Sequence, residues 1–417
     1  MKTKAVRLHG AMDVRYGEFD LPEINDNEVL LHVISDTICT STYKAVVQGS
    51  AHKRVPDDVA ENPIILGHEM CGEIAQVGKN LEGKWHVGQR VLVQPSLKLE
   101  NLKDPGYSYP YIGGNSIYAV VPEVVLERGC LFPFNGDSFF SGSLVESLGC
   151  VLRGYKQMYH IDYTNYHRTD GAKKDGKVAI LAGAGPMGIG AVELAIGYTG
   201  AKQVVVTDID EGRLQDAAKK CSPEKAKVRG VSLSYVNTAG VENAAALLKE
   251  ISNGGFDDVM VMAPVASLFT LAEAICAEDG CINFFAGSAT HELPGTLNLY
   301  RLHYDGIKVL GTTGSVPEDT VDIIKLIEDK AIETGALISH IVGLKALPEA
   351  IYAMKKPYGA KKVCYADLDI PLVALSDFAE MGKTDPLYKN LDEIVKRNGG
   401  TWCAEAEQYL LANAPKL

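Results

Sequence analysis

The sequence predicts a mixed α/β protein with two domains, one rich in β-strands and one built on a doubly wound parallel sheet. The chain has 417 residues, more than one hydrophobic core usually serves, and 46% of them are hydrophobic. The hydrophobic pattern also changes along the chain, from short alternating runs to buried runs that alternate with helical segments. The pattern changes near Lys177, and we place the domain boundary between residues 152 and 153.

The first domain, beginning with residues 1–152, is predicted from short runs in which hydrophobic and polar residues alternate. Such alternation is typical of strands that bury one face. Gly, Pro and Asn separate the runs, as expected for turns. The clearest runs are EVLLHVIS at 28–35, EIAQVG at 73–78 and RVLVQP at 90–95.

The second domain, residues 153–315, is predicted from hydrophobic strands that alternate with helices. This alternation is typical of a parallel sheet with helices on both faces. Helices are expected over 186–198 and from Glu211 onward. The expected strands are VAILAG at 178–183, VVVTD at 204–208, VMVMA at 259–263, INFFAG at 282–287 and VLGTTG at 309–314.

Two stretches fit neither pattern. Residues 155–175 are polar and aromatic without clear periodicity, and we expect a long excursion between the domains there. The C-terminal extension, residues 365–417, contains two predicted amphipathic helices, DPLYKNLDEIVKRN and TWCAEAEQYLLAN, around Gly399 and Gly400. We expect these helices to pack against a neighbouring domain or subunit.

The composition excludes several classes of protein. The formal net charge of -12 would repel the phosphates of a nucleic acid. The nine cysteines are scattered without a CxxC pair, which is typical of reduced thiols rather than a disulfide framework. The charged N-terminus, MKTKAVRLHG, lacks an apolar core, and no hydrophobic run is long enough to span a membrane. We therefore expect a cytoplasmic enzyme without a nucleic-acid or membrane partner.

A glycine-rich loop, GAGPMG from Gly183 to Gly188, follows the first strand of the second domain and opens a helix. The first glycine makes the tight turn, Gly185 lets a pyrophosphate approach the backbone, and Gly188 allows the helix to pack closely on the strand. Pro186 and Met187 lie where the helix N-terminus offers free N–H groups to phosphate. The loop predicts a bound pyridine dinucleotide.

The next strand ends at Asp208, 20 residues after Gly188. A carboxylate at this point accepts hydrogen bonds from both ribose hydroxyls and repels a 2′-phosphate, so NAD(H) is favoured and NADP(H) is not excluded. Asp208 also has a structural alternative as a helix N-cap, because Asp210 and Glu211 follow it. Arg213 is a second candidate for the ribose, or an ordinary exposed arginine.

Side chains of metal-ligand type stand out in the first domain: Cys39 in ICTSTYK, His68 and Glu69 in GHEMCGEIAQVG, and Glu146 in LVESLGC. A thiolate, an imidazole and a carboxylate suit tetrahedral zinc with its fourth position open, and the two anionic ligands neutralise the metal. Taken singly, each residue has a structural explanation as a buried thiol, a core histidine or an N-cap carboxylate.

A longer motif surrounds His68. It consists of G-H-E-x-x-G at 67–72 followed by Gly78, Gly88, Arg90 and Val91. With this pattern the chain resembles the zinc-dependent medium-chain alcohol and polyol dehydrogenases over residues 2–363. The resemblance implies a GroES-like catalytic domain, a Rossmann nucleotide domain, and two-fold assembly into a homodimer or homotetramer.

The resemblance also implies a role for each candidate ligand. Catalytic zinc in this family is held by residues that correspond to Cys39, His68 and Glu146, with Glu69 behind them or transiently on the metal. Glutamate as the third ligand resembles the sorbitol dehydrogenase branch. Ser41 corresponds to the hydroxyl that begins the proton relay.

Three features of the chain qualify this resemblance. Lys44 occupies the position of the histidine that often ends the relay, which leaves the terminal proton acceptor open. Residues 96–114 lack the four cysteines of many relatives, so we predict one catalytic zinc and no structural zinc. The chain is expected to return after the nucleotide domain, so that residues 316–417 complete the catalytic domain, with His340 in a structural role.

For the substrate, Lys44 near the ligands and Arg153 after Glu146 are candidates to bind a phosphate, or ion-pair partners. The overall layout resembles the bacterial L-sorbose-1-phosphate reductases. We therefore expect hydride transfer between a nicotinamide and a polyol or ketose phosphate. The specific reaction that we expect is the reduction of L-sorbose 1-phosphate to glucitol 6-phosphate. The alternatives are a free-polyol dehydrogenase, a zinc-independent quinone or enoyl reductase, and a non-enzymatic protein on the same fold.

Overall fold

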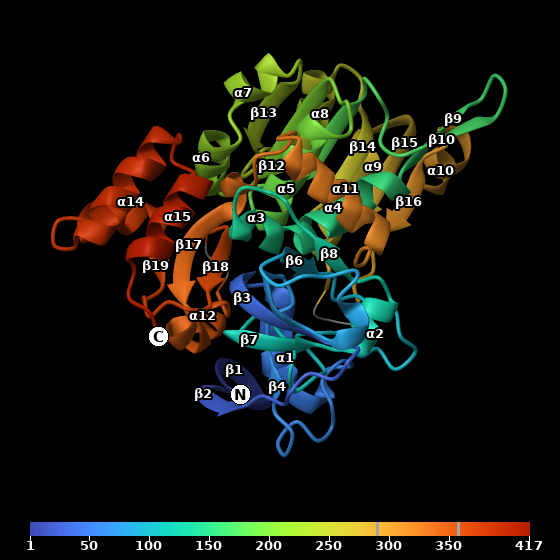
Figure 1. The fold of residues 1–417 in the computed structure, drawn as a ribbon. Helices are drawn as coiled ribbons and strands as arrows, with labels where there is room; N and C mark the ends of the chain where they lie inside the picture. Colours follow the sequence, from blue (N-terminus) through green and yellow to red (C-terminus); the bar gives the residue numbers. More distant parts are fainter. Residues whose placement is uncertain (289–291, 357–358) are drawn as a thin grey trace. The chain divides into compact units, whose positions relative to one another are not determined.

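The computed structural model of the protein describes residues 1–288, 292–356 and 359–417. The chain forms two compact units, and both termini belong to unit 1 (Figure 1). Among the described residues, no helix is long and apolar enough to cross a membrane. Unit 1 contains residues 1–146, 316–328 and 338–417, and unit 2 contains residues 147–315 and 329–337.

Unit 2 is built on a sheet with the strand order β13-β12-β11-β14-β15-β16, in which every pairing is parallel (Figure 1). Its first strand lies in the middle and later strands extend the sheet on both sides, which confirms the doubly wound fold. The elements are β11 (Lys177–Leu181), α5 (Pro186–Gly197), β12 (Gln203–Asp208), α6 (Glu211–Lys220), α7 (Pro223–Val228), β13 (Ser232–Asn237), α8 (Ala244–Ser252), β14 (Phe256–Val261), α9 (Ala266–Ile275), β15 (Cys276–Phe284), α10 (Leu299–Tyr304) and β16 (Lys308–Gly311).

Unit 1 contains a large sheet ordered β19-β17-β18-β3-β5-β6-β8, with β7 paired to β3, and a small sheet ordered β2-β1-β4. The first segment of unit 1 contains β1 (Lys2–Gly10), β2 (Asp13–Asp20), β3 (Val29–Thr37), α1 (Thr40–Gln48), β4 (Ile64–Ile65), β5 (Met70–Val77), β6 (Arg90–Val93), β7 (Tyr118–Val121), α2 (Glu123–Glu127), β8 (Leu131–Pro133) and α3 (Phe139–Ser143). Helix α4 (Val145–Gln157) begins in unit 1 and continues into unit 2.

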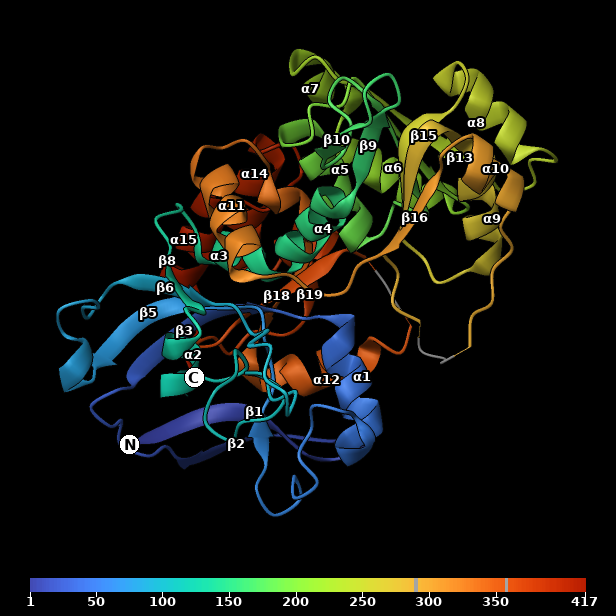
Figure 2. The same ribbon diagram turned by 90° about the vertical axis from the view of Figure 1, so that its right-hand side faces the viewer.

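The returning part of the chain completes unit 1. It contributes α11 (Pro317–Glu328), β17 (Ile338–Gly343), α12 (Leu347–Ala353), β18 (Lys361–Tyr365) and β19 (Val373–Ala374). Strand β18 pairs antiparallel with the end of β3, where Val363 lies opposite Thr37. Helix α12 lies beside α1 (Figure 2), and Ala45 and Ile351 belong to the same buried cluster. The first and last parts of the sequence therefore share one core.

The C-terminal extension forms α13 (Phe378–Met381), α14 (Pro386–Arg397) and α15 (Ala404–Asn413), which confirms the two predicted helices. The extension is anchored through Trp402, whose indole N–H donates to the Tyr365 hydroxyl at 2.8 Å. Tyr365 donates in turn to Glu407 on α15 at 3.0 Å. The extension thus packs within its own chain, on unit 1.

Residues 155–175, where we expect a long excursion, contain an antiparallel hairpin formed by β9 (Tyr159–Asp162) and β10 (His167–Asp170). Its β10 strand is exposed along its whole length, which removes the alternation that identifies a strand in a sequence. Residues 152 and 153, between which we place the domain boundary, lie in α4, and the first segment of unit 1 ends at Glu146 near the start of the same helix.

Candidate active site

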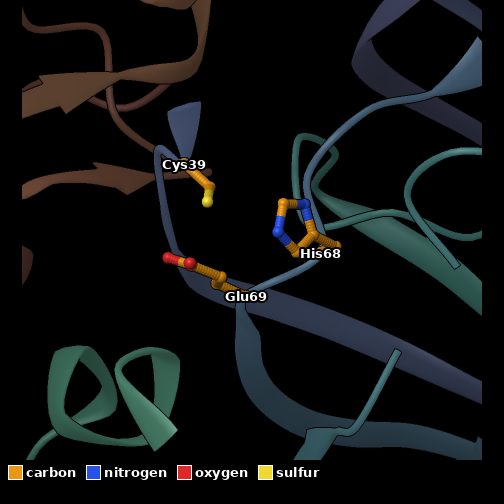
Figure 3. Close-up of side chains that lie close together, drawn as sticks. All are labelled: Cys39, His68 and Glu69. Carbon is orange, nitrogen blue, oxygen red and sulfur yellow. The ribbon is translucent and has the colours of Figure 1, made fainter. Parts of the chain in front are cut away.

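Three side chains of metal-ligand type converge in unit 1. Cys39 lies between β3 and α1 as the N-cap residue, and His68 and Glu69 lie immediately before β5. The thiol sulfur, an imidazole nitrogen and a carboxylate oxygen lie within 4.8 Å of one another. Figure 3 shows the Cys39 sulfur and the His68 ring on opposite sides of a common gap, with Glu69 along its lower edge. The fold therefore brings Cys39 and His68 together as expected of two ligands.

The turn that carries His68 is held by a buried carboxylate. Asp36 accepts a hydrogen bond from the Glu69 backbone N–H at 2.9 Å and another from the Asn115 side-chain amide at 2.8 Å. Burial raises the pKa of Asp36 to about 7. Gly67 has a φ of +90°, and a side chain there would collide with Asp36 and Asn115. The turn therefore requires glycine before His68.

Glu69 is enclosed by donors from its own unit. It is buried, Lys361 Nζ lies 2.5 Å from both of its carboxylate oxygens, and the Thr37 hydroxyl donates to one of them. Burial acts to lower the pKa of Lys361, but the negative charges of Glu69 and Cys39 outweigh it and raise that pKa. These contacts fix the orientation of the Glu69 carboxylate, one oxygen of which lies within 4.8 Å of the Cys39 sulfur and of a His68 nitrogen.

Glu146 lies in the first turn of α4, near the same group. Within the described ranges, the cluster of ligand atoms closer than 4.8 Å does not include its carboxylate. Burial raises the pKa of Glu146 to about 7, and the charges of His68, Glu69 and Cys39 also act on it. The charge of Glu146 therefore interacts with the charges of the cluster.

Ser41 connects the ligand group to an aromatic side chain. Its hydroxyl donates to Cys39 Sγ at 2.9 Å and accepts from the Tyr107 hydroxyl at 2.8 Å. The Tyr107 ring stacks on the His68 ring with 4.6 Å between centroids, and its oxygen lies 3.2 Å from His68 Nε2. Lys44 follows Ser41 by one turn of α1, so the two residues share one face of the helix.

The glycine-rich loop has the geometry that a dinucleotide requires. A side chain at Gly188 would meet the Gly183 carbonyl oxygen at 2.1 Å, whereas one at Gly185 would meet no atom within 4 Å. Gly188 is therefore required for packing, and Gly185 leaves open space on the loop. Pro186 begins α5 directly after Gly185, with Met187 next.

Asp208 lies at the end of β12, in contact with the loop. One carboxylate oxygen accepts from the Ala184 N–H at 3.3 Å, and the other accepts from Ile209 N–H at 2.8 Å. The N-cap of α6 is Asp210, whose side chain accepts from the Arg213 N–H. The N-cap alternative for Asp208 is therefore wrong, and the half-exposed Arg213 side chain on α6 has its guanidinium 3.9 Å from Asp210.

Comparison with known proteins decides the family. Residues 25–128 match the alcohol dehydrogenase GroES-like domain, and residues 186–329 match the zinc-binding dehydrogenase domain. The chain is 39% identical over 418 residues to the L-sorbose 1-phosphate reductase of Klebsiella pneumoniae, an alignment that covers 100% of this chain and 98% of that protein. The chain belongs to the zinc-binding alcohol dehydrogenases.

This zinc-binding alcohol dehydrogenase is also 38% identical over 412 residues to the mannitol-1-phosphate 5-dehydrogenase of Aliivibrio fischeri, with 98% of this chain and 97% of that protein covered. Its fold matches the crystal structure of 2R,3R-butanediol dehydrogenase from Bacillus subtilis with a TM-score of 0.72 at 21% identity, over 88% of this chain and 100% of that one. These matches confirm the predicted fold class and the assignment to the oxidoreductases.

The residues of this dehydrogenase fit a zinc ion. Its sulfur, imidazole and carboxylate donors are of the types that tetrahedral zinc prefers, and they converge in a largely buried part of unit 1. Sequence patterns did not identify Lys361 or Tyr107. Lys361 stands beside Lys362 in the otherwise apolar strand KKVCY, a visible signal, whereas nothing in the surrounding residues 96–114 marks Tyr107.

Proposed function

We propose that the protein transfers a hydride between a nicotinamide dinucleotide and the secondary alcohol or ketone of a phosphorylated polyol. The preferred reaction is the interconversion of L-sorbose 1-phosphate and glucitol 6-phosphate. The observation that carries the proposal is the convergence of Cys39, His68 and Glu69 beside Ser41, in a chain that also has a dinucleotide loop at Gly183.

Cys39 and His68 would hold the zinc together with Glu146, the third ligand that the family resemblance implies. Glu69, whose carboxylate lies within 4.8 Å of the other two ligand atoms of the cluster and contacts Lys361, would lie beside the metal. When bound, zinc stabilises negative charge on the substrate oxygen. In the oxidising direction, the carbon-bound hydrogen would leave as a hydride to the nicotinamide, and the substrate hydroxyl proton would pass to the Ser41 oxygen while Ser41 releases its own hydroxyl proton outward. Tyr107 donates to Ser41 and thereby orients the serine lone pair. In the reducing direction each transfer is reversed.

The loop from Gly183 to Gly188 would bind the pyrophosphate at the N-terminus of α5. Asp208 would accept hydrogen bonds from the adenosine ribose, which favours NAD(H), with Arg213 as a second contact on α6. We also propose, from the family resemblance, a homodimer or homotetramer.

The proposal of a phosphorylated substrate is supported by two relatives that align over almost the whole chain. One is named a reductase of L-sorbose 1-phosphate and the other a 5-dehydrogenase of mannitol 1-phosphate. The test is a steady-state comparison of L-sorbose 1-phosphate with free L-sorbose, each with NADH and with NADPH. We expect a higher kcat/KM for the phosphorylated ketose and for NADH. Equal values for phosphorylated and free ketose would favour the free-polyol dehydrogenase.

A zinc-independent quinone or enoyl reductase is the second candidate within this family. The cluster of Cys39, His68 and Glu69 weighs against it, because a reaction without metal does not need these donors together. Metal analysis distinguishes the two. We expect about one zinc per chain, and activity that persists in metal-free protein would support the second candidate.

A further inference from the structure

The segment that follows α1 brings basic residues next to the aromatic ring that contacts the candidate metal site. The His52 ring stacks on the Tyr107 ring with 5.8 Å between centroids and 11° between planes. The Arg54 guanidinium carbon lies 5.4 Å from the centre of the same Tyr107 ring. Because Tyr107 also contacts Ser41 and His68, one ring links the basic segment to the reacting end of the site.

Arg54 is held in a defined orientation. Its Nε donates to Asp104 at 2.6 Å, and the other Asp104 oxygen accepts from the Leu97 N–H at 3.1 Å. Within the described parts of the chain, its two terminal nitrogens donate to no protein acceptor. The side chain is 31% exposed. An anchored, partly exposed guanidinium of this kind keeps the fork of terminal N–H groups that binds phosphate oxygens in pairs.

His52 adds a neutral donor to this group. Its Nδ1 accepts from the Arg54 backbone N–H at 3.3 Å, so in the neutral ring the proton lies on Nε2. Burial, and then the positive charges of Arg54, Lys53 and Lys44, lower the pKa of His52 to about 4. The ring is therefore uncharged near pH 7. The charges of all three cations therefore act on the His52 ring.

The positive charge of Lys44, Lys53 and Arg54 is opposite in sign to the net charge of the whole protein, which is formally -12. Asp104 faces Arg54 and offsets part of its charge, but Lys53 and Lys44 add to the positive side. Lys44 also lies one turn after Ser41 on the same face of α1. A local excess of positive charge that begins beside the proton-relay serine suits an anionic group on the substrate itself.

We propose that Lys44, Lys53 and Arg54, together with the His52 Nε2–H, bind the phosphate of the substrate. This proposal rests on the proposed function, because it assumes that the substrate carries a phosphate. It extends that function by assigning the phosphate to the segment 44–54 of unit 1, with Tyr107 between it and the ligand His68.

The test compares Arg54→Gln and Lys53→Gln with the wild-type holoenzyme. Glucitol 6-phosphate and mannitol 1-phosphate are each measured against the free hexitol with NAD. We expect Arg54→Gln to lower kcat/KM for the preferred hexitol phosphate by roughly tenfold to a hundredfold, and to change the free hexitol by less than about threefold. Arg54→Lys should recover part of the loss, because it keeps the charge without the fork. Lys79→Gln, at another exposed lysine of unit 1, is the matched control.

Calorimetric titration with glucitol 6-phosphate provides a readout that does not depend on turnover, and Arg54→Gln should weaken that binding without changing zinc content. If the wild-type enzyme prefers the phosphorylated hexitol and both variants keep that preference, the phosphate lies elsewhere and only this inference is overturned. If the wild-type enzyme neither prefers nor binds hexitol phosphates over free hexitols, the proposed substrate is wrong and this inference with it.

Discussion

At the scale of single residues, the buried negative charge of Glu69 is stabilised mainly by the positive charge of Lys361. Its carboxylate is surrounded by Lys361 and Thr37, with the backbone N–H of the same residue donating to Asp36. Carboxylate and ammonium are both buried, so the pair tolerates loss of both charges better than loss of one. The pair also joins β18 to the turn before β5.

We expect Lys361→Met to lower the free energy of unfolding by about 3–5 kcal/mol, because it leaves the Glu69 carboxylate buried without a cation. The double variant Lys361→Met with Glu69→Gln should recover part of this loss. Both are measured by denaturant unfolding, with Lys356→Met at an exposed lysine as control. A loss below about 1 kcal/mol in the single variant would mean that water or rearrangement replaces the ammonium.

At the scale of elements, two glycines in the loop before α5 have different roles: Gly188 is needed for packing, and Gly185 leaves space for the pyrophosphate. We expect Gly188→Ala to destabilise unit 2, because its Cβ would meet the Gly183 carbonyl oxygen at 2.1 Å. Gly185→Ala should leave the unfolding midpoint nearly unchanged, since nothing lies within 4 Å of the new Cβ, yet weaken NADH binding at least tenfold (~1.4 kcal/mol) by obstructing the pyrophosphate. NADH fluorescence titration and thermal unfolding measure the two effects. Equal loss of stability in both variants would contradict this division.

The C-terminal extension contributes a pH-dependent element. Burial raises the pKa of Glu407 to about 7, although Phe139 and Phe140 donate their backbone N–H groups to it at 2.6 and 2.8 Å. Between the ordinary pKa of 4.5 and about 7, the folded protein keeps a proton that the unfolded chain has lost. Unfolding then releases this proton, so the contribution of Glu407 to stability falls as pH rises through that window.

We therefore expect the free energy of unfolding of the wild-type protein to fall relative to that of Glu407→Gln, by up to about 1.4 kcal/mol per pH unit, between about pH 5 and about pH 7. Denaturant unfolding at several pH values measures the difference between the two slopes. Parallel slopes would show that the hydrogen bonds from α3 keep Glu407 ionised throughout.

Secondary structure was predictable where the hydrophobic period was strong. The central strands of unit 2 and the helices around Gly399 and Gly400 follow their patterns. The β9–β10 hairpin was not predicted, because all four residues of β10 are exposed and the strand has no apolar face. A hairpin of this kind is defined by backbone hydrogen bonds, which leave little trace in composition.

At the scale of the whole molecule, the two sites belong to different units. The metal-ligand group lies in unit 1, and the loop at Gly183 and the carboxylate of Asp208 lie in unit 2. We expect a zinc chelator such as 1,10-phenanthroline to abolish turnover while NADH binding, followed by fluorescence, changes less than about threefold. Added zinc should restore turnover. Parallel loss of NADH binding and activity would show that the nucleotide site depends on the metal.

The candidate site was predictable in part. Cys39, His68 and Glu69, whose ligand atoms lie together, were candidates because a local motif contains His68 and Glu69 and the family pattern supplies Cys39, whereas the role of Glu146 stays a prediction. Lys361 and Tyr107 were not, because their roles arise from contacts across 292 and 39 residues of sequence. Long-range contacts of this kind depend on strand pairing, such as that of β18 with β3, which hydrophobic period alone does not specify.

The pairing of β18 with β3 has a consequence for the order in which the protein is made. The end of β3, from Ser35 to Thr37, pairs on one side with a strand that begins at Lys361. During synthesis from the N-terminus, unit 2 emerges from the ribosome before this strand does. Until that strand is synthesised, the edge of β3 is unpaired and Glu69 lacks the positive charge of Lys361. The nucleotide-binding unit can already fold during this time. Chaperone contact during translation is expected to concentrate on that early segment.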